Sequence, residues 1–457
     1  MTGVKAPVWV RLLDAAAIGC LCLTGVVLLF GSIDLHFSLT PWRINSPLEL
    51  LFVAAAIAAV RHAAHPTPPL HARVRDWARA VAERRQRRAA VVALTSRVAV
   101  LAAGYLAVRI IGMTALSSGF HVSPHPLINL PARFDAGWYA SIALEGYSFG
   151  GNFERQENVA FFPAFPLLMR TLGYPLGAFG PGLPREKRMV RLLWGGVALS
   201  LMAFAWAAAY LWRLARDLLG EDRAASRAVF LLAAYPFAVY FSAAYTESVF
   251  LLGAVAAVYH FRREAWAAAG AWGLLVGLTR PNGCFLSVVL AALIVERRQI
   301  STSANSQMSK SLAAAAMPGI GMLAFSLYVR QLTGHLFGWV RLHESAWGRT
   351  YHGLGLHGSV SSYDACNAAA LAFALLMVWP VMRRAGPALA LFVLINVVPP
   401  LVAGGLLSMG RLTSTLFPVF IALAAISSSR TVATLVTAFA LGQAAVAAIF
   451  FSWRPLF

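Results

Sequence analysis

The sequence predicts an all-α polytopic membrane protein, a bundle of about thirteen transmembrane helices. The chain is 59% hydrophobic and its mean hydropathy is +0.68, values that soluble domains do not reach. Apolar segments of roughly 15–23 residues recur along its whole length, and short connectors rich in arginine separate them. No polar stretch is long enough to form a soluble domain, so we expect one integral membrane domain with embedded loops.

Each expected helix is an apolar run that ends at a charged or proline-containing connector. The predicted spans are 12–31, 47–61, 95–113, 190–213, 228–244, 247–262, 265–279, 283–296, 311–331, 364–382, 387–407, 412–427 and 432–451. Several of them are short, which indicates tilted or partly buried helices. The segment 159–180 is also apolar, but three prolines and Arg170 argue against a span. We therefore predict that it is re-entrant or interfacial.

The distribution of basic residues supports this prediction. If 159–180 does not cross, the basic residues of the later connectors share one side with the N-terminus, as the positive-inside rule requires. They are Arg213, Arg216, Arg223, Arg227, Arg262, Arg263, Arg297, Arg298, Lys310, Arg383, Arg384 and Arg430. The exception is the basic run 185–191. The same rule accounts for most of the net charge of +20, so we do not expect nucleic-acid binding.

Two regions of different character follow from these patterns. Residues 1–92 read as an N-terminal extension of two helices followed by a basic cytoplasmic linker, and residues 93–457 as the main transmembrane domain. The loop 114–189 is then the first outer loop. The four cysteines lie in or beside apolar spans without metal-ligand spacing, so we expect neither a metal site nor a disulfide.

The most informative polar segment is the sequence Arg-Phe-Asp-Ala-Gly-Trp-Tyr at 133–139 of this outer loop. Acidic residues are scarce, with 18 Asp and Glu in 457 positions. Asp135 precedes a stretch in which Phe134, Trp138 and Ile142 share one helical stripe beside Tyr139, as expected of an interfacial helix. A carboxylate there can act as a general base toward an acceptor hydroxyl. The alternative is that Asp135 only caps this helix.

Several segments together resemble the PIG-V family, the second mannosyltransferase of GPI-anchor synthesis, which has bacterial relatives. They are Arg133-Phe134-Asp135-Ala136, Asn158-Val159-Ala160-Phe161-Phe162-Pro163, Tyr245-Thr246-Glu247-Ser248, Thr279-Arg280-Pro281-Asn282-Gly283 and His343-Glu344-Ser345-Ala346-Trp347-Gly348-Arg349. Pro281 stands where the family has Ser. The resemblance covers roughly residues 95–427.

This resemblance implies a GT-C type glycosyltransferase: a helical bundle whose outer-face loop bears interfacial helices. It implies a polyprenyl-phosphate sugar as donor, inversion at the sugar carbon, no metal or other cofactor, and an outer-loop acid, here Asp135, as the base. The donor phosphate needs a cation, and arginine suits bidentate contacts to phosphate. The candidates are Arg280, Arg349 and Arg411, with His343 and Arg341 behind them. Snorkelling of each arginine to lipid headgroups is the alternative.

Five further residues are candidates for binding substrate, namely Tyr245, Glu247, Asn282 and the two aromatics Trp138 and Tyr139. Glu247, beside Tyr245, reads as the partner of one of these arginines, or alternatively as a second acid or base. Asn282 can bind a sugar or acceptor hydroxyl, although Pro-Asn-Gly is also a common turn sequence.

The predicted function is transfer of a hexose, mannose by the resemblance, from the lipid-linked donor to a lipid or glycan acceptor. We expect the periplasmic face of a bacterial inner membrane, because the chain is rich in Ala and Arg and has no ER retrieval signal. One alternative is a sugar or lipid transporter or flippase, which would place charges at the bilayer midplane in repeated broken helices. Another is an inactive assembly subunit.

Overall fold

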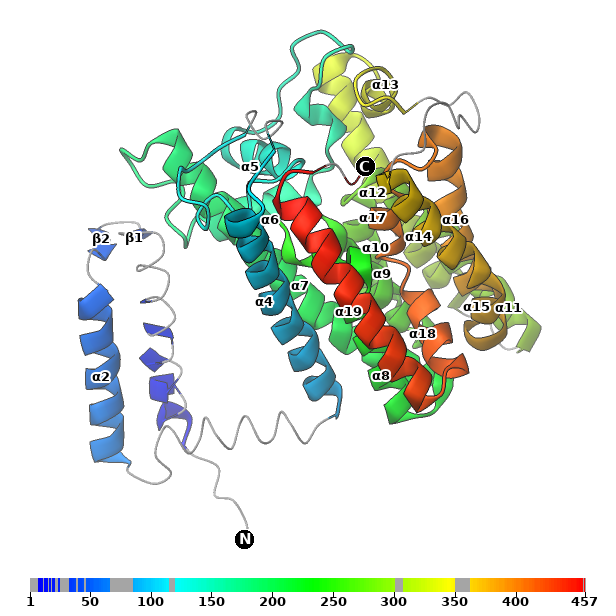
Figure 1. Cartoon of the computed structure of the whole chain (residues 1–457), viewed down its shortest axis with the longest axis horizontal. Helices are drawn as coiled ribbons and strands as arrows, with labels where there is room; N and C mark the ends of the chain where they lie inside the picture. The colour runs from blue at the N-terminus through cyan, green and yellow to red at the C-terminus, as the bar shows by residue number, and fades with distance from the viewer. Residues whose placement is uncertain are drawn as a thin grey trace.

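The computed structural model describes most of the chain (Figure 1). The described residues are 33–37, 40–44, 47–65, 85–114, 120–300, 307–349, 362–454 and 456, with scattered positions between 7 and 24. Much of the expected first helix at 12–31, most of the linker at 62–92 and the end of the loop at 332–363 lie outside the described residues.

Helices dominate the described part, and most of them pack into one bundle (Figure 1). In chain order the helices are α2 (Pro47–Ala64), α4 (Arg85–Ile110), α5 (Ala136–Glu145), η2 (Asn158–Ala160), α6 (Ala164–Gly173), α7 (Arg185–Leu219), α8 (Asp222–Ala234), η3 (Pro236–Ser242), α9 (Glu247–Arg262), α10 (Trp266–Gly277), η4 (Pro281–Phe285), α11 (Leu286–Ile300), α12 (Met308–Thr333), α13 (Gly338–Ser345), α14 (Ser362–Leu376), α15 (Val378–Ala385), α16 (Pro387–Gly404), α17 (Met409–Thr413), α18 (Phe417–Ile426) and α19 (Ser429–Phe451). Buried apolar side chains from α4 to α19 form one continuous core.

The expectation of a purely helical chain needs one correction. Strands β1 (Ile33–Phe37) and β2 (Thr40–Ile44) form an antiparallel hairpin in which Ile33 pairs with Ile44. The alternation Ile-Asp-Leu-His-Phe has the period of two that a strand requires, so this signal was present in the sequence. It lies between two apolar runs and is easily read as a loop.

The expected thirteen transmembrane helices are not confirmed. Among the described residues, six helices are long and apolar enough to cross a membrane, or up to seven if a bent pair counts as one span. Other predicted spans contain short helices, such as α10 with 12 residues and α18 with 10. The six long apolar helices nevertheless indicate an integral membrane protein.

The predicted span 228–244 is a broken helix, with α8 and η3 meeting at 82°. A break frees backbone carbonyls that must be satisfied inside the protein. Arg97 of α4, which is fully buried, donates to the Ala233 and Ala238 carbonyls. Gln443 of α19 donates to the Ala233 and Tyr235 carbonyls at 3.1 and 2.8 Å. The break redirects the chain so that η3 leads into the start of α9.

The segment 159–180 contains only one α-helix, α6, which has ten residues. Such a helix is about 15 Å long, roughly half of the hydrocarbon core, so the segment does not cross as a single helix. This agrees with the prediction of an interfacial segment. Helices α5 and α13 lie at the end of the bundle where the C-terminus is found (Figure 1).

Candidate functional site

Asp135 is held at the start of α5 by strained and anchored neighbours. Phe134 has a φ of 43° and its ring packs 4.6 Å from that of Trp453. A left-handed conformation at a bulky residue costs on the order of 1–3 kcal/mol, and it persists only where the surroundings impose it. The buried Arg133 supplies part of that constraint, because it donates to the Phe451 carbonyl at the end of α19 at 2.7 Å.

The carboxylate of Asp135 does not cap its helix. Asp135 occupies the N-cap position of α5, but its side chain makes no capping hydrogen bond. It instead forms an ion pair with Arg411, whose Nη1 lies 2.5 Å from Oδ2. The interpretation of Asp135 as only a helix cap is therefore wrong, because its oxygens face a cation from a distant helix.

Arg411 reaches this point because α17 is a five-residue helix fixed on several sides. The Gly410 N–H donates to Oδ1 of Asn367 at 2.7 Å, and the hydroxyls of Thr413 and Tyr235 lie 2.9 Å apart. At Gly410 a Cβ atom would lie 2.1 Å from the ring of Phe237. Only glycine permits this close approach of α17 to η3.

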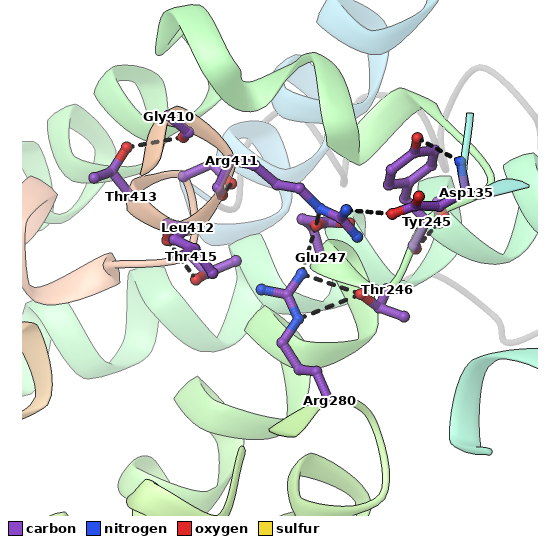
Figure 2. Close-up of polar contacts among 12 residues, drawn as sticks. Asp135, Tyr245, Thr246, Glu247, Arg280, Gly410, Arg411, Leu412, Thr413 and Thr415 are labelled. Atoms are coloured by element: carbon purple, nitrogen blue, oxygen red, sulfur yellow. Dashed lines mark hydrogen bonds and ion pairs between the residues drawn. The ribbon is translucent and has the colours of Figure 1, made fainter. Parts of the chain in front are cut away.

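Four charged side chains form a continuous chain of ion pairs, which we call the charged quartet (Figure 2). The quartet consists of Asp135, Glu247, Arg280 and Arg411. Oε1 of Glu247 accepts hydrogen bonds from both arginines, and its distance to Nη2 of Arg280 is 2.5 Å. Figure 2 shows Arg411 between the two carboxylates. Two acids balance two arginines, so the quartet is neutral as a whole.

Exposure increases steadily along the quartet. The side chain of Glu247 is 0% exposed, that of Arg280 8%, that of Arg411 14% and that of Asp135 22%. Burial alone would lower the pKa of Arg411, but the carboxylates of Glu247 and Asp135 raise it well above its ordinary value. The quartet therefore has a closed end at Glu247 and an open end at Asp135.

Aromatic and hydroxyl groups complete the surroundings of the two arginines. The guanidinium of Arg411 lies 4.6 Å from the ring centre of Tyr245, and that of Arg280 lies 4.9 Å from Phe250. Such cation–π contacts stabilise a partly desolvated arginine by about 1–2 kcal/mol. The Thr246 hydroxyl also accepts a hydrogen bond from Nη2 of Arg280 at 3.0 Å. Arg280 is thus fixed by two different side chains besides the ring.

Two buried atoms of the quartet have no hydrogen-bond partner in the described part of the chain. They are Oε2 of Glu247 and Nη1 of Arg280. A buried charged group that leaves an atom unpaired is costly, so each such atom calls for a water or a ligand atom. An acceptor and a donor therefore remain available beside the ion pairs.

Two tyrosines connect the backbone of Asp135 to the core. The Asp135 N–H donates to the Tyr245 hydroxyl at 3.1 Å, and that hydroxyl lies 3.4 Å from the Arg133 carbonyl, to which it donates. The ring of Tyr139 packs edge-on against Tyr245 at 6.2 Å. Burial raises the pKa of Tyr139 to about 12, so its hydroxyl stays neutral at physiological pH. Both tyrosines thus support the position of Asp135 without adding charge.

An aromatic wall stands next to the quartet. Trp138 stacks on Phe161 at 5.7 Å and meets Trp347 edge-on at 6.0 Å, and Trp347 lies 5.9 Å from His343. These four side chains are all partly buried. Partly buried aromatic faces beside charged groups are typical of the lining of a ligand site.

His343 belongs to this wall as a neutral side chain. Its Nδ1–H donates to the Trp339 carbonyl at 2.7 Å, which leaves Nε2 as an acceptor. Its pKa is lowered to about 4, because burial disfavours the charged ring more strongly than the Trp339 carbonyl favours it. Arg349 lowers this pKa further and Asp135 raises it, so both charges lie within electrostatic reach of the ring. His343 therefore offers an acceptor and not a charge.

The remaining predicted residues are described by contacts outside the quartet. Arg349 packs on Gly404, with its Nη1 3.2 Å from where a Cβ would stand, and its backbone N–H donates to the His343 carbonyl. Asn282 lies in η4 and donates to Oδ1 of Asn396 at 2.8 Å, which ties η4 to α16. Arg341 covers the ring of Phe153 at 4.5 Å.

Sequence reasoning did not foresee two of the supporting residues. Arg97 is an arginine inside an apolar helix, a type of residue that is rare without a function, and this signal alone would have singled it out. Asn367, which orients α17, gave no such signal, because an asparagine near a helix start is common. The described residues contain no group of three His, Cys, Asp or Glu side chains that could hold a metal ion.

Comparison with known proteins agrees with the resemblance seen in the sequence. No curated protein matches the chain. The match to a family model spans residues 120–329, which include Asp135, Tyr245, Glu247 and Arg280 but not Arg349 or Arg411. That segment is matched by the model of the family described as Mannosyltransferase (PIG-V), which is the family that the sequence motifs resemble. The match suggests glycosyltransferase activity, and the long apolar helices of the described residues suggest an integral membrane protein.

Proposed function

We propose that this protein is an inverting GT-C glycosyltransferase that moves a hexose, mannose by its family, from a polyprenyl-phosphate donor to a lipid or glycan acceptor. The observation that carries the proposal is the ion pair of Asp135 with Arg411 at the open end of the charged quartet. It places a carboxylate that can accept a proton within 2.5 Å of a cation that can bind a phosphate. The proposed reaction uses both groups, one for the proton and one for the phosphate.

The proposed step is a single displacement. The acceptor hydroxyl gives its proton to Asp135 while its oxygen attacks the anomeric carbon of the donor. The bond from that carbon to the phosphate oxygen breaks, and the phosphate leaves with one additional negative charge. Arg411, held in place by Glu247, stabilises that charge as it develops. Attack from the side opposite the leaving group inverts the configuration of the sugar.

The aromatic wall gives the sugar a place in this scheme. Trp138 and Trp347 can cover the ring of the transferred hexose, and Nε2 of His343 can accept a hydrogen bond from one of its hydroxyls. The quartet and the wall meet at α5, which carries both Asp135 and Trp138. The sugar would therefore lie between the base and the aromatic side chains.

We propose further that the site faces the periplasm from a bacterial inner membrane. The basic connectors predicted by the positive-inside rule support this orientation, since the quartet lies on the outer loops of that topology. The donor in such a reaction carries its sugar phosphate at the level of the outer headgroups. Its polyprenyl tail would remain in the bilayer beside the bundle.

The test is transfer of radiolabelled mannose from polyprenyl-phosphate-mannose to a crude lipid extract. We compare the purified wild type with Asp135→Ala and with Asp135→Asn, which keeps the size of the side chain. We expect loss of at least about a hundredfold in both variants, the effect of removing a general base. Glu145→Ala is the control, because Glu145 lies in the same loop but pairs with the exposed Arg185.

Equal transfer by wild type and both Asp135 variants would overturn the role of Asp135. Absence of transfer by every protein, repeated with polyprenyl-phosphate-glucose, would favour the transporter reading instead. Circular dichroism and size-exclusion chromatography show whether each variant is folded.

A further inference from the structure

Arg411 contacts both carboxylates of the quartet, but it holds them differently. Its Nε donates to Glu247, which is completely buried, and its Nη1 donates to Asp135, which is the most exposed member. Its second terminal nitrogen, Nη2, has no hydrogen-bond partner within the described residues, and this atom is not fully buried. Burial therefore keeps Glu247 in contact with Arg411, whereas Asp135 lies at the solvent-exposed end of the quartet.

We propose that Asp135 and the donor phosphate compete for Arg411, so that donor binding displaces the Asp135 carboxylate and releases it to act as the base. This inference rests on the proposed function and adds the order of events, in which donor binding comes before release of the base. In the free protein Asp135 is occupied by a guanidinium. After the exchange, Arg411 holds the phosphate and Asp135 is free to accept a proton from the acceptor.

The charges of the quartet explain why an exchange is required. The free quartet has two acids and two arginines, so an anion that simply added to it would leave an excess of negative charge in a largely buried place. Glu247 cannot move away, because it is 0% exposed and accepts from both arginines. Asp135 can, because its carboxylate is partly exposed to solvent.

Arg280 is the less suitable cation for this exchange. It is more buried than Arg411, and its Nη2 is engaged by both Glu247 and Thr246. Its Nη1 is unpaired, but this atom is closed off from solvent. Arg411 has an open nitrogen and stands beside the base. A guanidinium that binds a carboxylate through one edge can bind phosphate in the same geometry, since both anions accept paired N–H donors.

The exchange also has a chemical consequence. While Asp135 is bound to the guanidinium, its Oδ2 is engaged by Nη1 of Arg411 and is not available to an acceptor hydroxyl. Displacement by the donor phosphate frees this oxygen, so the base becomes available only when donor is present. At the same time Arg411 moves to the group that gains negative charge as the sugar leaves, where its contribution to the transition state is largest.

The experiment measures binding of polyprenyl phosphate, without sugar or acceptor, to the wild type, Asp135→Asn, Arg411→Gln and the double variant in nanodiscs. Removing the competing carboxylate frees Arg411, so we expect Asp135→Asn to bind about three- to tenfold more tightly, as for loss of a partly exposed ion pair. Arg411→Gln should bind more weakly, and in its background the Asp135→Asn change should have no effect. We thus expect Asp135→Asn to lose transfer activity and yet to bind the phosphate more tightly, a combination that a merely structural role does not produce.

Two controls identify the source of any change. Glu145→Gln removes a carboxylate from an arginine pair of the same loop, and its affinity should equal that of the wild type. The neutral polyprenol of the same length should bind all variants equally, since it has the tail without the phosphate. Arg411→Lys replaces Arg411→Gln if the latter does not fold, and it should retain part of the affinity.

Equal or weaker binding by Asp135→Asn would overturn the exchange, and would mean that Asp135 orients Arg411 for the phosphate. A gain that persists in the Arg411→Gln background would overturn it as well. Either outcome leaves the transfer assay untouched, because loss of activity in Asp135→Ala tests the base and not the competition. Conversely, full transfer by Asp135→Ala would overturn the role of Asp135 as the base whatever the affinities are.

Discussion

Glu247 offers the sharpest test of the charged quartet, because it holds both arginines with one oxygen. In the variant Glu247→Gln the side chain keeps its size but loses its charge. Arg280 and Arg411, which are 8% and 14% exposed, are then left side by side without the acid between them. Breaking a buried ion pair by removing one partner costs about 3–5 kcal/mol, because the remaining charge is uncompensated. We expect a loss of stability in this range.

The assay is unfolding of the purified protein in mixed micelles, followed by circular dichroism. The control is Glu145→Gln, which breaks an ion pair whose side chains are 51% and 57% exposed, and which we expect to change stability by less than about 1 kcal/mol. The double variant Glu247→Gln with Arg280→Gln should recover part of the loss, because it also removes Arg280, whose carboxylate partner was Glu247, while Arg411 keeps its ion pair with Asp135. A loss below about 1 kcal/mol for Glu247→Gln would refute the reasoning.

Two further predictions concern packing and pH. Gly277→Ala should destabilise the protein by about 1–3 kcal/mol or more, because the added Cβ would lie 1.9 Å from the Pro318 carbonyl oxygen. The control is Gly319→Ala, whose Cβ would meet nothing closer than 3.5 Å, and which should be nearly neutral in the same unfolding assay. Equal effects of the two substitutions would contradict the close contact of α10 with α12. The pKa of His343 is lowered from 6.5 to about 4 in the folded protein. Between about pH 6.5 and 4 the unfolded chain therefore binds a proton that the folded protein does not, so the free energy of unfolding falls as the pH falls through this window. Thermal unfolding at pH 5 and 7.5 should therefore show a smaller pH effect for His343→Gln than for the wild type, and an unchanged pH effect would show that the ring does not resist protonation.

The local properties of the chain were readable from the sequence. Apolar runs and their arginine-rich connectors depend only on neighbouring residues, so they predicted a helical membrane protein and an interfacial segment around α6. Asp135 was also identified as a candidate base from its neighbours along the chain alone, since an acidic residue among interfacial aromatics is unusual. Short motifs also suggested the family whose model matches residues 120–329.

Only the tertiary structure decided which residues meet. Arg280, Arg349 and Arg411 were equivalent candidates by composition, but the partner of Asp135 is Arg411, 276 positions away, and no pattern along the chain encodes a contact at that separation. The break between α8 and η3 has the same origin, because the carbonyls that it frees are satisfied by Arg97 and by Gln443, which lie 346 positions apart. Hydropathy records how much each segment prefers lipid over water. Which charges are buried together depends on how the helices pack, and that packing is a property of the whole chain.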